Sequence, residues 1–182
     1  MKPEDMIERV ENLTHESYSK ETWMQWFNDA LQDLAPVIKL ESYEEFAING
    51  TSRDLPGDVM DIVKLKIDDK LFTRGVMGTE NRNHFWVWED SVNFHESHNG
   101  QVKLWYFRYP DVFHLGSTAP DIQTPYLGAV IIFAASRSKA PDRWLHDKAD
   151  HFQDYLIRKS EIERERNRQL RQPRFAKARG WR

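Results

Sequence analysis

The sequence contains no cysteine, and this absence excludes several kinds of site at once. A chain without thiols has no disulfides, no thiolate metal ligands and no cysteine nucleophile, and it suits a reducing compartment. No apolar run approaches the ~20 residues that a membrane-spanning helix needs, so we expect no membrane partner. The G-x-S-x-G, Walker A and G-x-G-x-x-G signatures are also missing. Nothing in the sequence nominates a catalytic pair or a cofactor site.

What the sequence does contain is ample core material and an uneven charge distribution. Its 182 residues suit one domain, or one domain with an insertion, and 13% of them are aromatic. The net charge of -3 conceals a basic C-terminal end, because ten Lys or Arg and only three Asp or Glu lie between Arg158 and Arg182. An acidic body with a basic end indicates a negatively charged partner for that end.

Helical periodicity marks both ends of the chain. A first helix is predicted to begin at Pro3. A second follows Ser19 as its N-cap, ends before Pro36, and carries an apolar stripe of Trp23, Trp26, Phe27, Ala30, Leu31 and Leu34. Near the C-terminus, Thr124-Pro125 predicts the start of a buried helix. A last helix is predicted from Pro141 to Gln172, with Phe152, Leu156 and Ile162 in its apolar stripe and a length of roughly 48 Å.

The middle of the chain changes to the periodicity of strands. Val63, Leu65 and Ile67 alternate with polar residues, and further strands are predicted at 85–88 and 102–109. Asn49-Gly50 and Asn99-Gly100 are interpreted as turns between strands. Aromatic residues lie on both faces of these strands, so either a helix or a neighbouring subunit must cover the second face.

This order predicts an α+β protein in which a helical domain carries an inserted small antiparallel β-sheet domain. We place the N-terminal helical part at 1–40, the inserted β domain at 41–118 and the C-terminal helical part at 119–161. A long helix extension with an extended basic tail occupies 162–182. The tail also carries Phe175 and Trp181, which a purely solvating end does not need, so we favour an arm that docks on a partner over a disordered end.

One short motif invites a metal-binding interpretation. His95-Glu96-Ser97-His98 supplies two imidazoles and a carboxylate, but it is not H-E-x-x-H and it precedes Asn99-Gly100. We interpret it as a polar hairpin loop and expect no metal site.

Several motifs, taken in order, resemble the head–tail connector (adaptor) proteins of tailed bacteriophages, which sit beneath the portal ring. The stretch from Trp23 to Leu34 is similar to the family's early helix, and Asp54-Leu55-Pro56-Gly57-Asp58-Val59 to the turn before its sheet. Leu104-Trp105-Tyr106-Phe107-Arg108-Tyr109-Pro110 is similar to its aromatic strand. Pro125-Tyr126 opening an Ala-rich helix, followed by a long charged helix, completes the pattern.

The resemblance implies a non-enzymatic virion protein of the phage neck, assembled in the host cytoplasm. Its partners would be the portal protein, copies of itself in a twelve-fold ring, the next neck or tail protein, and packaged DNA that passes through the lumen without sequence specificity. The C-terminal arm would bind the portal. Its expected portal- or partner-binding residues are Arg164, Arg168, Arg171, Arg174, Phe175, Lys177, Arg179, Trp181 and Arg182.

Two other functions remain open from the sequence. A nucleic-acid-binding module could use the basic tail to grip phosphates, although no Lys/Arg comb interleaves the sheet aromatics in the sequence. A small metal-dependent enzyme could use His95 and His98, and this is the weaker alternative.

Overall fold

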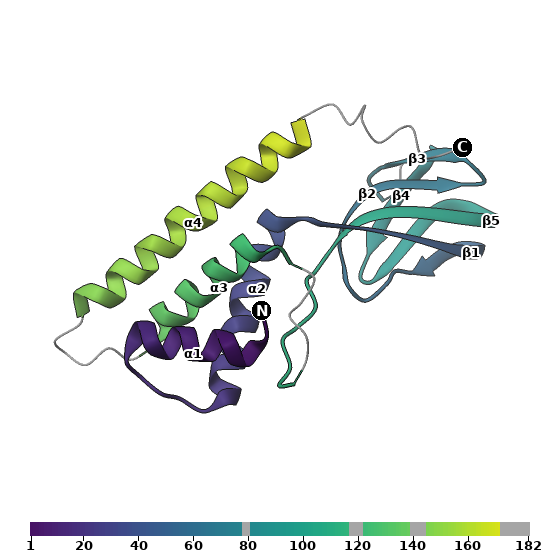
Figure 1. The fold of residues 1–182 in the computed structure, drawn as a ribbon. Helices are drawn as coiled ribbons and strands as arrows, with labels where there is room; N and C mark the ends of the chain where they lie inside the picture. The colour runs from purple at the N-terminus through teal and green to yellow at the C-terminus, as the bar shows by residue number, and fades with distance from the viewer. Residues whose placement is uncertain (78–80, 117–121, 139–144, 172–182) are drawn as a thin grey trace. The chain divides into compact units, whose positions relative to one another are not determined.

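The computed structural model describes residues 1–77, 81–116, 122–138 and 145–171, with side chains of the last helix described from 150 to 170. The chain is α+β and divides into two units. One unit comprises Met1–Ile38 with Pro110–Arg182, and the other comprises Lys39–Tyr109 (Figure 1). The helices belong to the first unit and the strands to the second. The β unit therefore ends before position 118, where the sequence analysis placed its boundary.

The helical unit is built from α1 (Pro3–Thr14), α2 (Lys20–Ile38), α3 (Thr124–Arg137) and α4 (Leu145–Arg171). Helix α3 contacts the other three, and its residues are apolar almost all round, as predicted for a buried helix. The core includes Met6, Val10, Trp23, Phe27, Leu34, Leu127, Val130 and Tyr155. Among the described residues, no helix combines the length and apolar character needed to cross a membrane.

Helix α2 begins as predicted and ends later than predicted. The backbone N–H of Thr22 donates to Ser19 Oγ at 3.2 Å, which confirms Ser19 as the N-cap. The predicted end before Pro36 is wrong, because the helix continues to Ile38. An internal proline costs about 3 kcal/mol. Burial of Val37 and Ile38 returns about 1.5–3 kcal/mol each, which is enough to offset that cost.

The segment that returns from the β unit is fastened to the helices by hydrogen bonds. Phe113 N–H donates to Asn28 Oδ1 at 2.7 Å, and Asn28 Nδ2 donates back to Phe113 O at 3.2 Å. Gly116 N–H donates to Glu4 Oε1 at 3.0 Å. Phe113 is itself buried against Phe27, with ring centroids 5.8 Å apart. The start of this returning segment is therefore part of the helical core.

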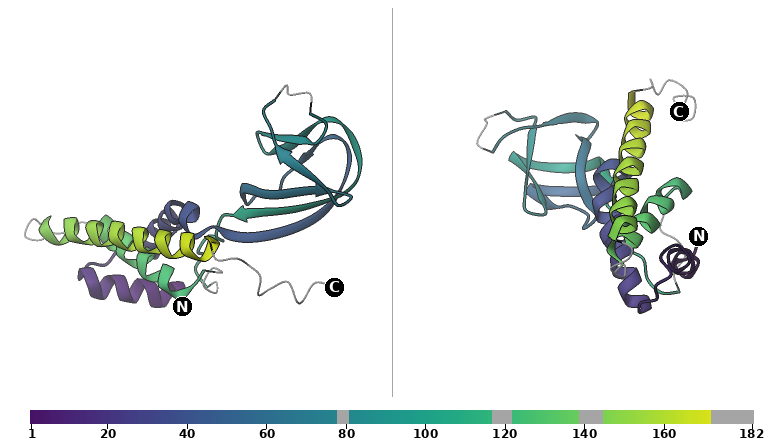
Figure 2. Two further views of the ribbon diagram at one scale, coloured as in Figure 1. Left: turned by 90° about the horizontal axis from the view of Figure 1, so that it is seen from above. Right: turned by 90° about the vertical axis from the view of Figure 1, so that its left-hand side faces the viewer.

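The second unit has five strands in the order β1-β5-β2-β3-β4, and β4 also pairs with β5. The strands are β1 (Leu40–Asp54), β2 (Val59–Ile67), β3 (Lys70–Arg74), β4 (His84–Trp88) and β5 (Ser91–Arg108). The prediction of a small antiparallel sheet is wrong, because the strands form a closed barrel that includes one parallel pairing. Strands β2, β3, β4 and β5 close into a small barrel, to which β1 adds a fifth strand (Figure 2).

The length of β5 explains why the sheet closes. Its 18 residues pair with β2 through Val102 to Arg108 and with β4 through Ser91 to Phe94. A parallel pairing between β3 and β4 completes the circuit, with Thr73 opposite His84. The enclosed core includes Leu65, Ile67, Phe72, Phe85, Val92, Phe94, Val102, Leu104 and Tyr106. Closure leaves few strand edges unpaired.

Both Asn-Gly pairs lie inside strands rather than at turns, so that part of the sequence interpretation is wrong. Asn49 pairs with Asn99, and Gly100 pairs with Ile48, in the long β1–β5 ladder. Gly100 is needed for space, because a Cβ at this position would lie 2.2 Å from Asp68 Oδ2. The other Asp68 carboxylate oxygen accepts the N–H of Gln101 at 2.9 Å. A side chain at position 100 would therefore displace the Asp68 carboxylate and its hydrogen bond to Gln101.

Candidate functional site

The last helix is held on the bundle by one buried phenol and one shared carboxylate. Tyr155 is 1% exposed, and its hydroxyl donates a short hydrogen bond to Asp33 on α2. Lys159, one turn later, donates to the same Asp33 oxygen at 2.7 Å. Ile162 is the last buried residue of α4 among those described. These contacts place the part of α4 from Tyr155 to Ile162 firmly on its neighbours.

Asp33 is electrostatically tuned by this arrangement. Partial burial alone would raise the pKa of the Asp33 carboxyl, but the hydrogen bonds from Lys159 and Tyr155 outweigh it and hold that pKa below its ordinary value. Burial, and then the hydrogen bond to Asp33, raise the pKa of Tyr155. At neutral pH the carboxylate is therefore ionised and the phenol is neutral.

Beyond Ile162, every described side chain of α4 is exposed or half-buried. Arg164 and Arg168 are exposed, as a partner-binding surface requires. Glu161 forms an ion pair with Arg158 at 3.0 Å, one turn earlier than the Glu161/Arg164 spacing considered in the sequence. Arg171 is the last residue of α4. The remaining predicted binding residues, Arg174, Phe175, Lys177, Arg179, Trp181 and Arg182, lie outside the described part of the chain.

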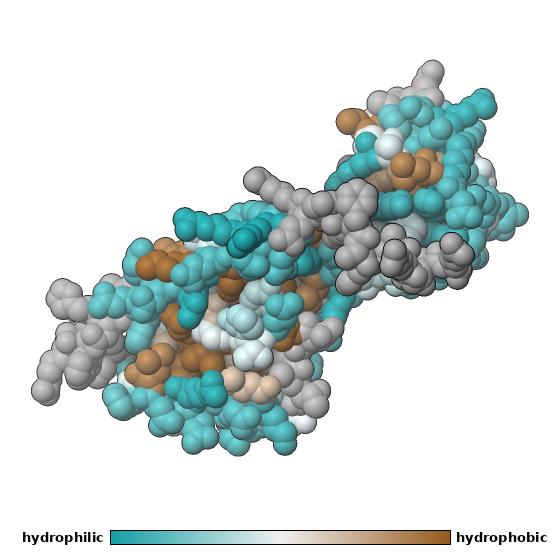
Figure 3. All heavy atoms as spheres, turned by 45° about the horizontal axis from the view of Figure 1, so that its top comes forward, coloured by the Kyte–Doolittle hydropathy of each residue, from teal (hydrophilic) through white to brown (hydrophobic). Residues whose placement is uncertain are grey.

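The earlier turns of α4 expose apolar side chains that the sequence analysis assigned to the core. Phe152 is 49% exposed and Leu156 is 42% exposed, and Ile157 next to Leu156 is exposed as well. The predicted stripe is therefore wrong at Phe152 and Leu156 and right at Ile162, because the core lies on the Tyr155 side of the helix. In Figure 3, apolar patches (brown) interrupt a largely hydrophilic surface on the helical unit. A helix with apolar side chains on two sides offers a contact surface for another subunit.

On the outside of the barrel, aromatic rings are covered by cationic side chains. Trp105 lies between Tyr43, whose ring centroid is 4.9 Å away, and Lys64, whose Nζ is 4.8 Å from the Trp105 centroid. Lys39 lies over Phe107 at 5.8 Å. A hydrogen bond to Glu45 raises the pKa of Tyr43 to about 12. Pairing of β2 with β5 places Lys64 directly beside Trp105, a contact between residues far apart in the sequence.

The His95–His98 segment is a strand and not a loop, so that prediction is wrong. Both histidines belong to β5, and their odd spacing places them on opposite faces of the strand. His98 packs against Phe72 and Phe94, with ring centroids 5.1 and 5.2 Å away. Within the described residues, no group of three or more His, Asp or Glu is placed to hold a metal ion.

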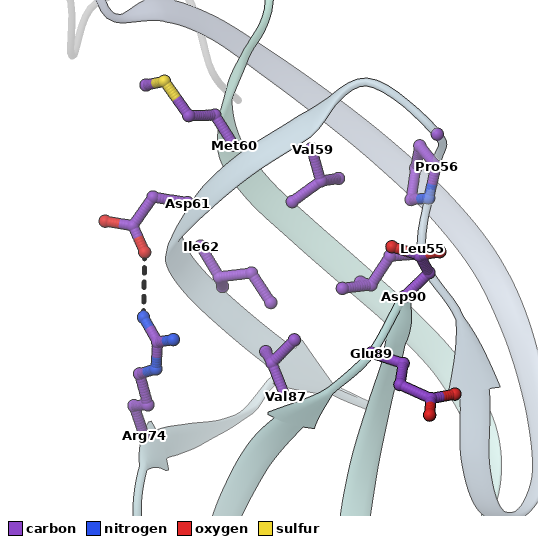
Figure 4. A pocket seen from close by; sticks show the side chains of 11 residues that line it. Leu55, Pro56, Val59, Met60, Asp61, Ile62, Arg74, Val87, Glu89 and Asp90 are labelled. Carbon is purple, nitrogen blue, oxygen red and sulfur yellow. Dashed lines mark hydrogen bonds and ion pairs between the residues drawn. The ribbon is translucent and has the colours of Figure 1, made fainter. Parts of the chain in front are cut away.

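A small pocket lies at one end of the barrel, and nothing in the sequence indicated it. It has a volume of about 180 Å³ and lies between the turn after β1, the start of β2 and the β4–β5 turn. Leu55, Val59, Ile62 and Val87 point toward one another across it (Figure 4). The Asp61–Arg74 ion pair, at 2.9 Å, lies on one side, and Glu89 and Asp90 lie on the other.

Comparison of the chain with protein-family models and with curated protein sequences finds no match. The functional assignment therefore depends on the features described above.

Proposed function

We propose that this chain is a structural head–tail connector of a tailed bacteriophage, which forms a ring under the portal with DNA passing through its lumen. The observation that carries the proposal is the form of α4. Tyr155, Lys159 and Ile162 fasten it to the bundle, and it then continues to Arg171 with exposed arginines and no buried side chain among those described. This form suits an arm that binds another protein, and the basic C-terminal sequence extends it.

Two further features support the proposal. Phe152 and Leu156 are exposed on the same helix, and a ring built of repeated contacts needs such apolar surface between copies. The motifs that resemble the connector family include Asp54-Leu55-Pro56-Gly57-Asp58, which forms the last residue of β1 and the turn before β2, and Leu104 to Arg108, which forms the end of β5. Exposed arginines can make charge-assisted, often bidentate, bonds to portal carboxylates.

The test uses rings of the portal protein encoded in the same genome. Sedimentation of these rings with the intact chain should saturate near one chain per portal subunit, and electron microscopy should show a ring of added density. Deletion of 172–182 should abolish stable attachment while it leaves the melting midpoint unchanged. A matched control replaces the same segment by a Gly/Ser sequence of equal length. If the truncated chain attaches as tightly as the intact one, the arm does not bind the portal.

A second candidate function is nucleic-acid binding, and the lysines over Trp105 and Phe107 favour it. A salt titration of DNA binding separates the two functions. A nucleic-acid-binding module should bind DNA with a steep salt dependence, which should weaken when 172–182 is deleted and weaken further when Lys39 and Lys64 are replaced by Ala. A connector should bind the portal, and bind DNA only weakly and without sequence preference.

A further inference from the structure

We propose that the barrel pocket binds the C-terminal segment of a second copy of this chain, with Trp181 in the pocket and arginines against its acidic edge. The inference goes beyond the proposed function and does not depend on it, because it requires no portal protein. It assigns a ligand to the pocket at the end of the barrel.

The volume of the pocket is large enough for one aromatic ring. Aliphatic side chains of Leu55, Val59, Ile62 and Val87 line part of the pocket and polar groups line the rest, and its volume is about 180 Å³. An apolar cavity of about 150 Å³ is known to hold benzene. An aromatic side chain of a partner would therefore find the space for its ring and an aliphatic wall to pack against.

The negative charge at the edge of the pocket favours a ligand in which basic residues stand next to the aromatic ring. Arg74 neutralises Asp61, but no ion pair of the described residues neutralises Glu89 or Asp90. A backbone hydrogen bond fixes the position of Asp90, because Leu55 N–H donates to Asp90 O at 2.8 Å. An aromatic residue with basic residues on each side is thus the complementary ligand.

The chain itself contains such a segment. Residues 172–182 read Gln-Pro-Arg-Phe-Ala-Lys-Ala-Arg-Gly-Trp-Arg, with four basic residues and no acidic one. Trp181 stands between Gly180 and Arg182, with Arg179 close by. The absence of a side chain at Gly180 lets the indole ring approach a wall closely. We choose Trp181 over Phe175 because arginines flank it on both sides.

A contact between the segment of one copy and the pocket of the next uses two different surfaces. Such heterologous contacts join subunits head to tail. The contact should be weak and salt-sensitive, because it consists of one aromatic anchor and a few exposed charges. The same segment on a portal ring would be withdrawn from the pocket, so the two contacts exclude each other.

The test measures binding of a fluorescein-labelled peptide of residues 172–182 to the full-length Trp181→Ala chain at low salt. We expect saturable anisotropy, at least tenfold weaker binding for the peptide that carries Trp181→Ala, and less than a threefold change for the one that carries Phe175→Ala. On the protein, Glu89→Gln with Asp90→Asn should weaken binding and flatten its salt dependence. The matched control, Glu8→Gln with Glu21→Gln, removes two exposed charges from the helical unit and should leave binding unchanged.

Three outcomes would overturn the proposal. The first is absence of peptide binding, and the second is binding that ignores both Trp181→Ala and the Glu89/Asp90 substitutions. The third concerns the intact chain in sedimentation, where we expect concentration-dependent association at low salt. If the intact chain stays monomeric and also does not bind the peptide, residues 172–182 of each chain occupy the pocket of that same chain. The proposed contact with a second copy would then be wrong. None of these outcomes bears on attachment to the portal.

Discussion

Asp33 is the residue on which attachment of α4 depends most directly, because its carboxylate accepts hydrogen bonds from both Tyr155 and Lys159. The two donors stand one turn apart on α4, whereas Asp33 lies on α2. Loss of the Asp33 carboxylate would leave the buried Tyr155 hydroxyl with a poorer acceptor and the Lys159 ammonium without its ion-pair partner. A buried polar group left unsatisfied costs about 1–3 kcal/mol.

We expect Asp33→Asn to lower the free energy of unfolding at pH 7 by about 1–2 kcal/mol. The pKa of Asp33 is lower in the folded chain than its ordinary value. Its stabilisation is therefore complete above about pH 4 and is lost as the pH falls through the folded-state pKa. Urea unfolding between pH 2 and 7 gives the free energy of unfolding at each pH. Below about pH 4 this free energy should fall less steeply for the variant than for the parent. Asp154→Asn, an exposed change on α4, is the control. The same pH dependence of the free energy of unfolding for Asp33→Asn and the parent would contradict the stabilising role of Asp33.

The two histidines of β5 should differ in their effect on stability. His98 contacts two phenylalanine rings, and such aromatic contacts are worth about 0.5–1.5 kcal/mol. His98→Ala should cost about 1 kcal/mol, whereas the exposed His95→Ala should change stability by less than ~0.5 kcal/mol. Thermal denaturation of the two variants measures the difference. Equal effects would show that the packing of His98 adds nothing.

At the scale of the element, α2 shows how one apolar stripe divides into core and border. Trp23 and Phe27 are fully buried, whereas Trp26 is half-buried and packs edge-on against Tyr18 and Trp23. The expectation that Trp26 belongs to the core is therefore only partly right. Its ring closes one side of an aromatic cluster and leaves its other side in water.

We expect Trp23→Ala to destabilise the chain by about 3–5 kcal/mol, as loss of a fully buried tryptophan does. Trp26→Ala should cost less than Trp23→Ala, since part of the area that it removes is already exposed. Chemical denaturation followed by far-UV circular dichroism gives both values. A larger loss of unfolding free energy for Trp26→Ala than for Trp23→Ala would show that the Trp26 side of α2, and not the Trp23 side, faces the core.

At the scale of the whole molecule, the β unit is an insertion whose two ends meet. Leu40 at the start of β1 is paired directly with Arg108 at the end of β5. The cores of the two units consist of separate sets of residues. An insertion that leaves and returns at one place can be removed without stretching the chain on either side.

Replacement of 39–109 by a short Gly/Ser linker should therefore leave a folded helical unit. We expect a cooperative thermal transition and helical circular dichroism without the strand contribution. A control linker placed between 15 and 19 of the intact chain tests whether added linker itself destabilises the helices. A shortened chain without a cooperative transition would show that the helical unit needs the barrel to fold.

The local sequence determined most of the helical unit. The stripe of α2, the Ser19 cap and the all-apolar α3 follow from side-chain spacing within one element, and the structure confirms them. Sequence periodicity also found α4, but it could not say which of two apolar sides faces the bundle. That choice depends on Tyr155 and its distant acceptor, Asp33.

The tertiary structure alone decided the β unit and its pocket. Asn99-Gly100 has the local preference of a tight turn, yet pairing with a strand 50 residues earlier in the chain, at Asn49 and Ile48, keeps it extended. Closure of the barrel depends on β5 reaching both β2 and β4, and the Trp105–Lys64 contact and the pocket around Val87 follow from that closure. Such pairings join residues far apart in sequence, so no local pattern encodes them.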